Sequence, residues 1–159
     1  MCKEIERKFL WNNDFDIWNV VAIYPRQVIM DHYFNKTTRL RVIDYLNGDK
    51  KQFITVKSIG TLERDEYEYE IKPIIDLPKP MLKKTRFCIP YKDHVFEVNM
   101  YDSYLYCPEY KGRLYLIEVE LEDKDEELEL PPWVGKEVTD SPYFYNYNIF
   151  DYLRNDISV

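Results

Sequence analysis

The chain has 159 residues, of which 45% are apolar and 16% aromatic, and its 22 basic and 29 acidic side chains give a net charge of −7. This length suits one domain, which we expect to span residues 1–159 and to bury roughly two-thirds of its unfolded surface. The composition is too apolar for a disordered chain. The acidic balance excludes an exposed basic patch of the kind that binds a nucleic-acid duplex.

Three cysteines, Cys2, Cys88 and Cys107, form an odd number without metal-binding spacing. They indicate free thiols in a reducing compartment. The N-terminal segment is charged and lacks the apolar core of a signal peptide. No run of about 18 apolar residues, the length needed to span a membrane, is present. We therefore expect a cytoplasmic protein with no membrane partner.

Alternation of apolar and polar side chains is the main structural pattern in the sequence. It predicts strands over residues 3–10, 28–35, 38–45, 51–58, 65–72, 83–90, 94–101 and 113–121. Turn-forming Asn47-Gly48 and Ile59-Gly60 separate two pairs of these strands. Helices are expected over residues 14–24, around 80–82 and over 148–155. The predicted class is mainly β, with a few flanking helices.

The polar faces of the predicted strands are almost entirely charged. Glu66, Glu68 and Glu70, for example, alternate with Tyr67 and Tyr69. One interpretation is a sandwich whose solvated face protects against aggregation. The alternative is a sheet closed into a barrel of about eight strands, with its charges inside. The recurrence of this pattern in seven strands favours the barrel.

Charges inside a barrel are costly unless they pair or bind ligands. Clustered carboxylates suit a hard divalent cation such as Mg²⁺ or Mn²⁺, and clustered Arg and Lys suit phosphate groups. The four glycines form no Gly-rich phosphate-binding loop, so side chains would have to bind the phosphate. An interior with both kinds of charge fits a metal-bound polyphosphate.

Several charged motifs follow one another in order along the chain. They are Glu4-Ile5-Glu6-Arg7-Lys8, Arg39-Leu40-Arg41, Thr55-Val56-Lys57, Glu66-Tyr67-Glu68-Tyr69-Glu70, Lys84-Thr85-Arg86 and Glu118-Val119-Glu120, with a tail over 133–139. The ordered set resembles the CYTH domain of the triphosphate tunnel metalloenzymes, over residues 2 to about 150. The resemblance implies a closed eight-stranded antiparallel β-barrel, with helices outside, that binds triphosphate and divalent cations.

The resemblance also implies a role for each matched position. The phosphate-binding residues would be Lys8, Arg39, Arg41, Lys57, Lys84 and Arg86. The ligands of Mg²⁺ or Mn²⁺ would be Glu4, Glu6, Glu118 and Glu120, with Glu68 and Glu70 as further ligands or water-positioning groups. Catalytic roles would fall to Lys8 and to Glu120 and Glu70, the two candidates for the general base.

Asn99 departs from the family pattern. The family usually has two acids separated by one residue on the seventh strand, where this chain has Glu97-Val98-Asn99. The carbonyl oxygen of Asn99 can still bind a metal ion but brings no charge, which bears on the occupancy of a second metal site. His32 is a further residue that could contact a phosphate group.

The resemblance favours metal-dependent hydrolysis of a triphosphate, with inorganic tripolyphosphate as the preferred substrate. The enzymatic alternatives are a nucleoside or thiamine triphosphatase and a class IV adenylate cyclase. A non-catalytic module that binds triphosphate or polyphosphate is the alternative from another class, and Asn99 keeps it open. The expected partner is a small triphosphate-containing molecule, bound by a monomer or a homodimer.

Overall fold

A computed structural model describes residues 2–157 of the chain. In chain order its elements are β1 (Cys2–Trp11), α1 (Ile17–Val21), β2 (Arg26–Tyr33), β3 (Thr38–Asp44), β4 (Lys50–Lys57), β5 (Glu63–Glu70), β6 (Leu82–Tyr91), β7 (His94–Cys107), β8 (Tyr110–Leu121), β9 (Val134–Glu137), a 3₁₀ helix η1 (Pro142–Phe144) and α2 (Asn146–Ile157). The strands form one antiparallel sheet in the order β5-β4-β3-β2-β6-β7-β8-β1-β9.

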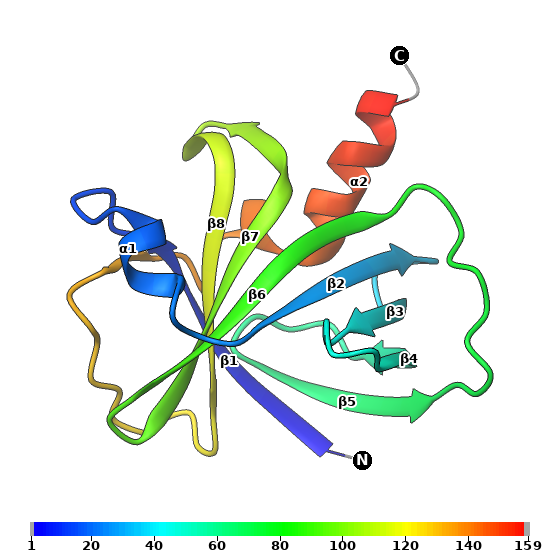
Figure 1. Cartoon of the computed structure of the whole chain (residues 1–159), viewed down its shortest axis with the longest axis horizontal. Helices are drawn as coiled ribbons and strands as arrows, with labels where there is room; N and C mark the ends of the chain where they lie inside the picture. The colour runs from blue at the N-terminus through cyan, green and yellow to red at the C-terminus, as the bar shows by residue number, and fades with distance from the viewer. Residues whose placement is uncertain (1, 158–159) are drawn as a thin grey trace.

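The sheet closes on itself because β1 pairs with β5 as well as with β8 (Figure 1). The closing ladder runs from Cys2 opposite Glu66 to Ile5 opposite Glu63. β1 to β8 therefore form the closed eight-stranded antiparallel barrel that the sequence predicts, and β9 adds a short strand beside β1.

Alternation along each strand separates an outer apolar face from a charged interior. On β1, Phe9 faces outward into an apolar cluster, whereas its neighbour Lys8 is buried on the opposite face. The cluster lies over the outer faces of β1, β6, β7 and β8 and is covered by α1 and by Trp133, which stacks on Trp11 with ring centroids 5.4 Å apart. The outward-facing apolar residues of these four strands are thus covered without using the interior, whereas Tyr67 and Tyr69 on β5 stay exposed.

A second apolar cluster lies at one end of the barrel, where η1 and α2 pack. Phe144 and Phe150 are fully buried and contact inward-facing Tyr33 and Tyr101, together with Leu116. In Figure 1, α2 lies beside the ends of β6 and β7. The C-terminal segment therefore covers one end of the barrel and positions residues near its interior.

Three local predictions differ from the structure. Residues around Pro80 form no helix, because prolines 73, 78 and 80 interrupt helical hydrogen bonding, and the segment stays irregular until β6 begins at Leu82. α1 is shorter than residues 14–24, since Asp16 caps it by accepting a hydrogen bond from the Trp18 N–H at 3.0 Å. β9 was not predicted, because four residues that include Gly135 carry no alternating pattern.

Two further predicted elements agree with the structure in type and differ from it only in length. The helix expected over 148–155 is confirmed within α2, and the strand over 94–101 extends to residue 107. Residues 1, 158 and 159 of the predicted domain lie outside the described residues. No helix within residues 2–157 is long and apolar enough to cross a membrane.

Phe144→Ala should lower the free energy of unfolding by about 3–5 kcal/mol, because it leaves a cavity between η1 and the barrel end. The neighbouring Tyr143 is 41% exposed, so Tyr143→Ala provides a matched control that should change stability by less than about 0.5 kcal/mol. Urea unfolding of the two variants measures the difference, and equal losses would contradict the packing of Phe144 against the barrel end.

Candidate active site

The barrel interior holds an unusual concentration of buried charge. Within the described part of the chain, the charged residues that are almost fully buried are Lys8, Asp31, Arg39, Arg41, Lys84 and Glu118. They come from β1, β2, β3, β6 and β8, so the closed sheet brings together residues more than a hundred positions apart. Each such charge loses its hydration and needs a partner of opposite sign or a bound ligand.

Glu118 is the central acid of this interior. Its Oε1 lies 3.8 Å from the Lys84 Nζ and 3.5 Å from Arg86 Nη2. Burial acts to raise the pKa of Glu118, but the charges of Lys84 and Lys8 hold it well below its usual range. Burial, partly offset by the charge of Glu118, lowers the pKa of Lys84 to about 7.

Glu6 lies beside Glu118 and forms a hydrogen bond with it. Burial, and then the negative charge of Glu118, raises the pKa of Glu6 well above its usual range. The Lys8 ammonium is 3.8 Å from the Glu6 carboxylate. Two buried carboxylates held this close repel one another when both are ionised, and a cation between them would relieve that repulsion.

Asn99 connects the acidic and basic sides of the interior. Its amide nitrogen donates to Glu118 Oε1 at 2.8 Å, and its carbonyl oxygen accepts from Arg86 Nε at 2.8 Å. Arg86 also forms an ion pair with Glu97 at 2.9 Å. Asn99 therefore orients Glu118 and Arg86 in this structure, and its predicted role as a metal ligand stays a prediction.

Asp31 fixes the arginine side of the interior. It is fully buried and accepts two hydrogen bonds from Arg41, at 2.7 and 2.8 Å, and the Arg39 Nε lies 4.0 Å away. Burial acts to raise the pKa of Asp31, but the charges of Arg41 and Arg39 hold it well below its usual range. Next to this group, burial raises the pKa of Tyr33 to about 12.

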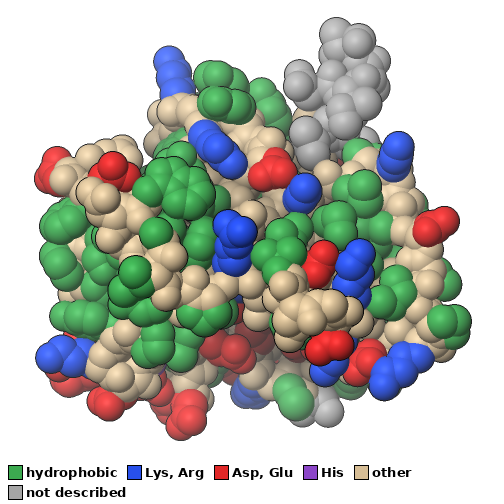
Figure 2. Space-filling model, in the orientation of Figure 1, with side chains coloured by type: hydrophobic (Ala, Val, Ile, Leu, Met, Phe, Trp, Pro, Cys, Tyr) green, Lys and Arg blue, Asp and Glu red, His purple; other side chains and the backbone are tan. Residues whose placement is uncertain are grey.

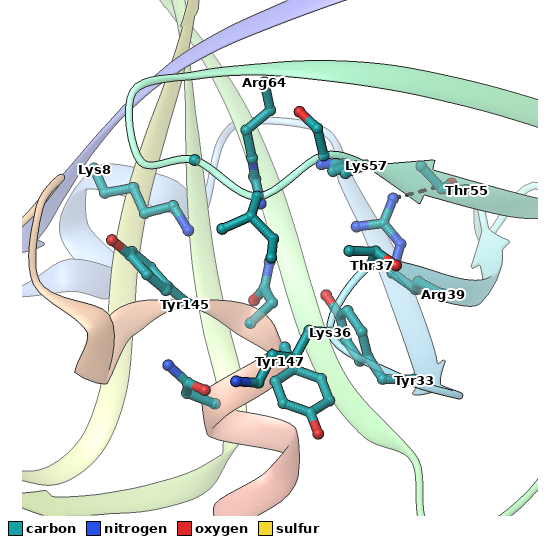
Figure 3. Close-up of a pocket in the computed structure, with 15 residues that line it drawn as sticks. Lys8, Tyr33, Lys36, Thr37, Arg39, Thr55, Lys57, Arg64, Tyr145 and Tyr147 are labelled. Atoms are coloured by element: carbon teal, nitrogen blue, oxygen red, sulfur yellow. Dashed lines mark hydrogen bonds between the residues drawn. The ribbon is translucent and has the colours of Figure 1, made fainter.

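A pocket of about 240 Å³ opens beside these residues (Figure 3). Among the described residues that line it there are five basic side chains and no acidic one. The basic residues are Lys8, Lys36, Arg39, Lys57 and Arg64. The rest of the wall includes Tyr33, Tyr145 and Tyr147 and the turn before β5. A pocket with this lining suits an anion with several oxygen atoms.

Two buried cations lack a hydrogen-bond partner for one nitrogen. Among the side chains that the structure describes, the buried nitrogens without a partner are Arg39 Nε and Lys84 Nζ. Buried polar atoms in folded proteins are nearly always hydrogen-bonded, directly or through water. These two nitrogens are therefore available to bond water or an anionic ligand inside the barrel.

Lys57 and Glu4 lie at the edge of the pocket in a small ion-pair network. Lys57 Nζ is 2.8 Å from a Glu4 carboxylate oxygen and 3.3 Å from Glu66, and Arg64 is 3.4 Å from Glu4. Glu68 accepts a hydrogen bond from the Thr55 hydroxyl at 3.1 Å. The structure thus brings most of the predicted residues to one connected interior.

Glu70 and Glu120 lie farther from the centre. Glu70 is exposed and pairs with Lys72 at 3.2 Å. Glu120 lies opposite Glu6 in the β1–β8 ladder and lines an acidic surface hollow at the other end of the barrel. The acidic residues of this hollow are Asp93, Glu97, Glu120, Glu122, Glu126 and Glu127. Figure 2 shows acidic side chains gathered along the lower edge of the face it presents.

Several site residues were not predicted. Asp31 is a single acid in an otherwise mixed strand, and Lys36, Arg64, Tyr145 and Tyr147 lie at or beyond strand ends, where alternation carries no information. His32 faces away from the phosphate-binding side, because its Nδ1 bonds the Pro80 carbonyl oxygen and its ring packs on Phe34 and Phe150.

The acidic residues of the interior are the candidate ligands of a divalent metal ion. Among the described residues, no three His, Cys, Asp or Glu side chains converge into a preassembled metal site. The Glu6–Glu118 pair nevertheless fits Mg²⁺ or Mn²⁺, because such an ion is commonly held by one or two carboxylates together with phosphate oxygens of the substrate. The paired, mutually repelling carboxylates are the feature that fits a cation.

The closed barrel and its charged interior define a β-tunnel protein. No protein-family model matches the chain. Over 157 residues it is 32% identical to an inorganic triphosphatase of Acetivibrio thermocellus, covering 94% of both chains. It is 31% identical to an inorganic triphosphatase of Nitrosomonas europaea, covering 90% of this chain and 93% of the relative. A crystal structure of an inorganic triphosphatase superposes with a TM-score of 0.52 at 26% identity, covering 94% of this chain and 95% of the other.

The chain therefore belongs to the inorganic triphosphatase family of CYTH, or triphosphate tunnel, proteins. The similarity extends over nearly the whole chain.

Asp31→Asn should lower the free energy of unfolding by about 3–5 kcal/mol, because it leaves the Arg41 guanidinium buried without its counter-ion. Asp44→Asn is the matched control. Asp44 lies at the end of β3, 3.9 Å from the exposed Lys50, and its loss should cost less than about 1 kcal/mol. Urea unfolding at pH 7 compares the two, and a small loss for Asp31→Asn would contradict the central role of this ion pair.

The Asp31–Arg41 pair should also give a pH-dependent contribution to stability. The folded-state pKa of Asp31 is below its unfolded value of about 3.9, so the stabilisation is fully present above that pH and is lost as the pH falls toward the folded-state pKa. The stability gap between wild type and Asp31→Asn should be constant from about pH 7 to 5 and shrink below about pH 4. Urea unfolding across this pH range measures the difference in unfolding free energy. A difference that grows as the pH falls would contradict a lowered folded-state pKa for Asp31.

Proposed function

We propose that this protein hydrolyses inorganic tripolyphosphate inside its tunnel, with a divalent metal ion as cofactor. The observation that carries the proposal is the pocket with five basic side chains beside the buried Glu6–Glu118 pair. The unpartnered nitrogens of Arg39 and Lys84 support an anionic substrate. The names of the two relatives, both inorganic triphosphatases, support the reaction.

Basic side chains bind and orient the substrate in this proposal. Lys8, Arg39 and Lys57 contact phosphate oxygens from the pocket side. Arg41, Lys84 and Arg86 complete the set from deeper in the barrel, and Asp31 holds Arg41 in a fixed orientation. Because the donors are already oriented in a largely dehydrated interior, positioning and electrostatics supply most of the reduction of the barrier.

Glu6 and Glu118 would hold the divalent cation, Mg²⁺ or Mn²⁺, with Glu4, Glu120, Glu68 and Asn99 as further proposed ligands. An ion held by these carboxylates would neutralise charge on the phosphate oxygens and on the leaving group. Lys8 lies between this acidic group and the pocket, 3.8 Å from Glu6, and balances the charge of both.

Glu120 is the better placed of the two candidates for the general base. It lies opposite Glu6 on the neighbouring strand and is open to solvent, so it can take a proton from an attacking water and release it to bulk water. Glu70 is exposed and paired with Lys72, and it lies four residues beyond Glu66, where the pairing of β5 with β1 ends. We therefore assign proton transfer to Glu120.

Glu6→Gln and Glu118→Gln should each abolish metal-dependent phosphate release from tripolyphosphate, by at least about a hundredfold in kcat/KM, because a buried carboxylate is lost from the cation site. Glu129→Gln removes the same charge from an exposed loop and is the matched control. Phosphate release with Mg²⁺ and with Mn²⁺ measures the effect, and near-normal turnover in both interior variants would overturn the proposed site.

A nucleoside triphosphate is the second candidate substrate, because its base could stack on one of the three tyrosine rings of the pocket. Tyr33 and Tyr147 instead pack on each other, with ring centroids 5.8 Å apart, which favours the inorganic substrate. We expect tripolyphosphate to have a higher kcat/KM than ATP or thiamine triphosphate in a substrate panel. Cyclic AMP formed from ATP would favour the cyclase, and binding without phosphate release would favour a non-catalytic module.

A further inference from the structure

Helix α2 begins at the wall of the basic pocket. Asn146, Tyr147 and Asn148, its first three residues, all line the pocket. In Figure 3 the helix starts below the pocket and runs away from it. The Ile149 N–H donates to the Tyr145 carbonyl at 3.0 Å and closes the first helical turn. The N–H groups of the three preceding residues have no acceptor within the helix, and the helix dipole places partial positive charge there.

A second observation at the same pocket points to a bound anion. The Arg39 side chain is 8% exposed, and Figure 3 shows its guanidinium pointing into the pocket. Its Nε has no hydrogen-bond partner, and the nearest carboxylate oxygen that it pairs with, on Asp31, is 4.0 Å away. Lys36, just before β3, adds another cation to the wall. The N-terminus of α2, Arg39 and Lys36 thus line the same pocket.

Lys8 marks the boundary between this space and the carboxylates. Its ammonium lies 3.8 Å from Glu6 on one side and 3.4 Å from the Phe144 carbonyl oxygen, just before α2, on the other. A linear polyphosphate that contacts Lys8 can therefore place one end near the Glu6–Glu118 pair and the other end near the first turn of α2.

We propose that the first turn of α2, together with Arg39 and Lys36, forms an anion subsite for the substrate phosphate group that lies farthest from Glu6 and Glu118. The ligand class, an inorganic polyphosphate, rests on the function proposed above; the subsite itself rests on the geometry of the pocket. It would hold the end of tripolyphosphate that is not being attacked and so fix the direction in which the chain lies in the tunnel.

The test is Asn146→Asp, a nearly isosteric change that adds a negative charge to the first turn. The side-chain oxygen of Asn146 accepts a hydrogen bond from the Tyr101 hydroxyl, and an Asp oxygen preserves that acceptor. An acid in the first turn also favours the helix, so folding should be retained. Asn47→Asp is the matched control, because it adds the same charge in the β3–β4 turn, where its oxygen accepts from the Asp49 N–H.

Tripolyphosphate binding is measured by calorimetry in low-salt buffer with EDTA, where no metal-dependent turnover occurs. Asn146→Asp should raise the Kd by about tenfold at unchanged thermal stability, and Asn47→Asp should leave it within about twofold. Lys36→Met, at an exposed position, is a second variant that should raise the Kd by about threefold. An unchanged Kd in Asn146→Asp, or an equal increase in the control, would overturn the subsite.

Steady-state kinetics with Mg²⁺ test the orientation. Because the subsite lies away from the bond that is cleaved, Asn146→Asp should raise KM by about tenfold and leave kcat within about twofold. A large loss of kcat with unchanged KM would overturn the orientation. If the wild-type protein binds tripolyphosphate but releases no phosphate, the proposed hydrolysis is refuted and the subsite still stands. If the wild-type protein is active and Asn146→Asp has the same KM and Kd, the subsite is refuted and the hydrolysis still stands.

Discussion

Closure of the sheet by the β1–β5 ladder is the constraint on which the rest of the structure depends. In an open sheet the alternating charged side chains would face water, where ion pairs contribute little. Closure turns that face into an interior, so each charge must be matched by a partner or a ligand. The bidentate Asp31–Arg41 pair and the Glu118–Lys84–Arg86 group meet this requirement. The incompletely paired nitrogens that remain are the part of the interior available to a substrate.

Most of the barrel could be predicted because strand alternation is a local property. The eight strands follow from period-two patterns, and the charged faces together with the ordered motifs distinguish a closed barrel from a sandwich. The additional strand β9 and the irregular segment around Pro80 could not be predicted in this way. β9 depends on a partner, β1, that is more than 120 residues earlier in the chain.

Site residues could be predicted where strand alternation places their side chains in the interior. They could not be predicted where their role depends on a residue of another strand. Lys8, Arg39 and Glu118 are buried in the interior because alternation places them there. Asp31 was missed because its importance comes from Arg41 on the neighbouring strand, and the first turn of α2 was missed because backbone N–H groups leave no pattern in the sequence. Asn99 shows the same limit: as an amide between Arg86 and Glu118 it donates to one and accepts from the other, which a carboxylate could not do.

The position of β1 in the sheet has a consequence for the order of folding. β1 is the first strand of the chain, yet its neighbours are β5, β8 and β9, with Ile5 opposite both Glu63 and Leu121. Contacts of such long sequence separation carry a large loop-closure entropy and slow the folding of β-proteins. β5 lies about 60 residues after β1, whereas β8 and β9 follow more than about 100 residues after it, so the two edges of β1 close loops of very different length. While an edge is unpaired, the charged residues Glu4, Glu6 and Lys8 keep the strand hydrated. The charges that serve the finished tunnel also protect an unpaired edge of β1 from association with other strands.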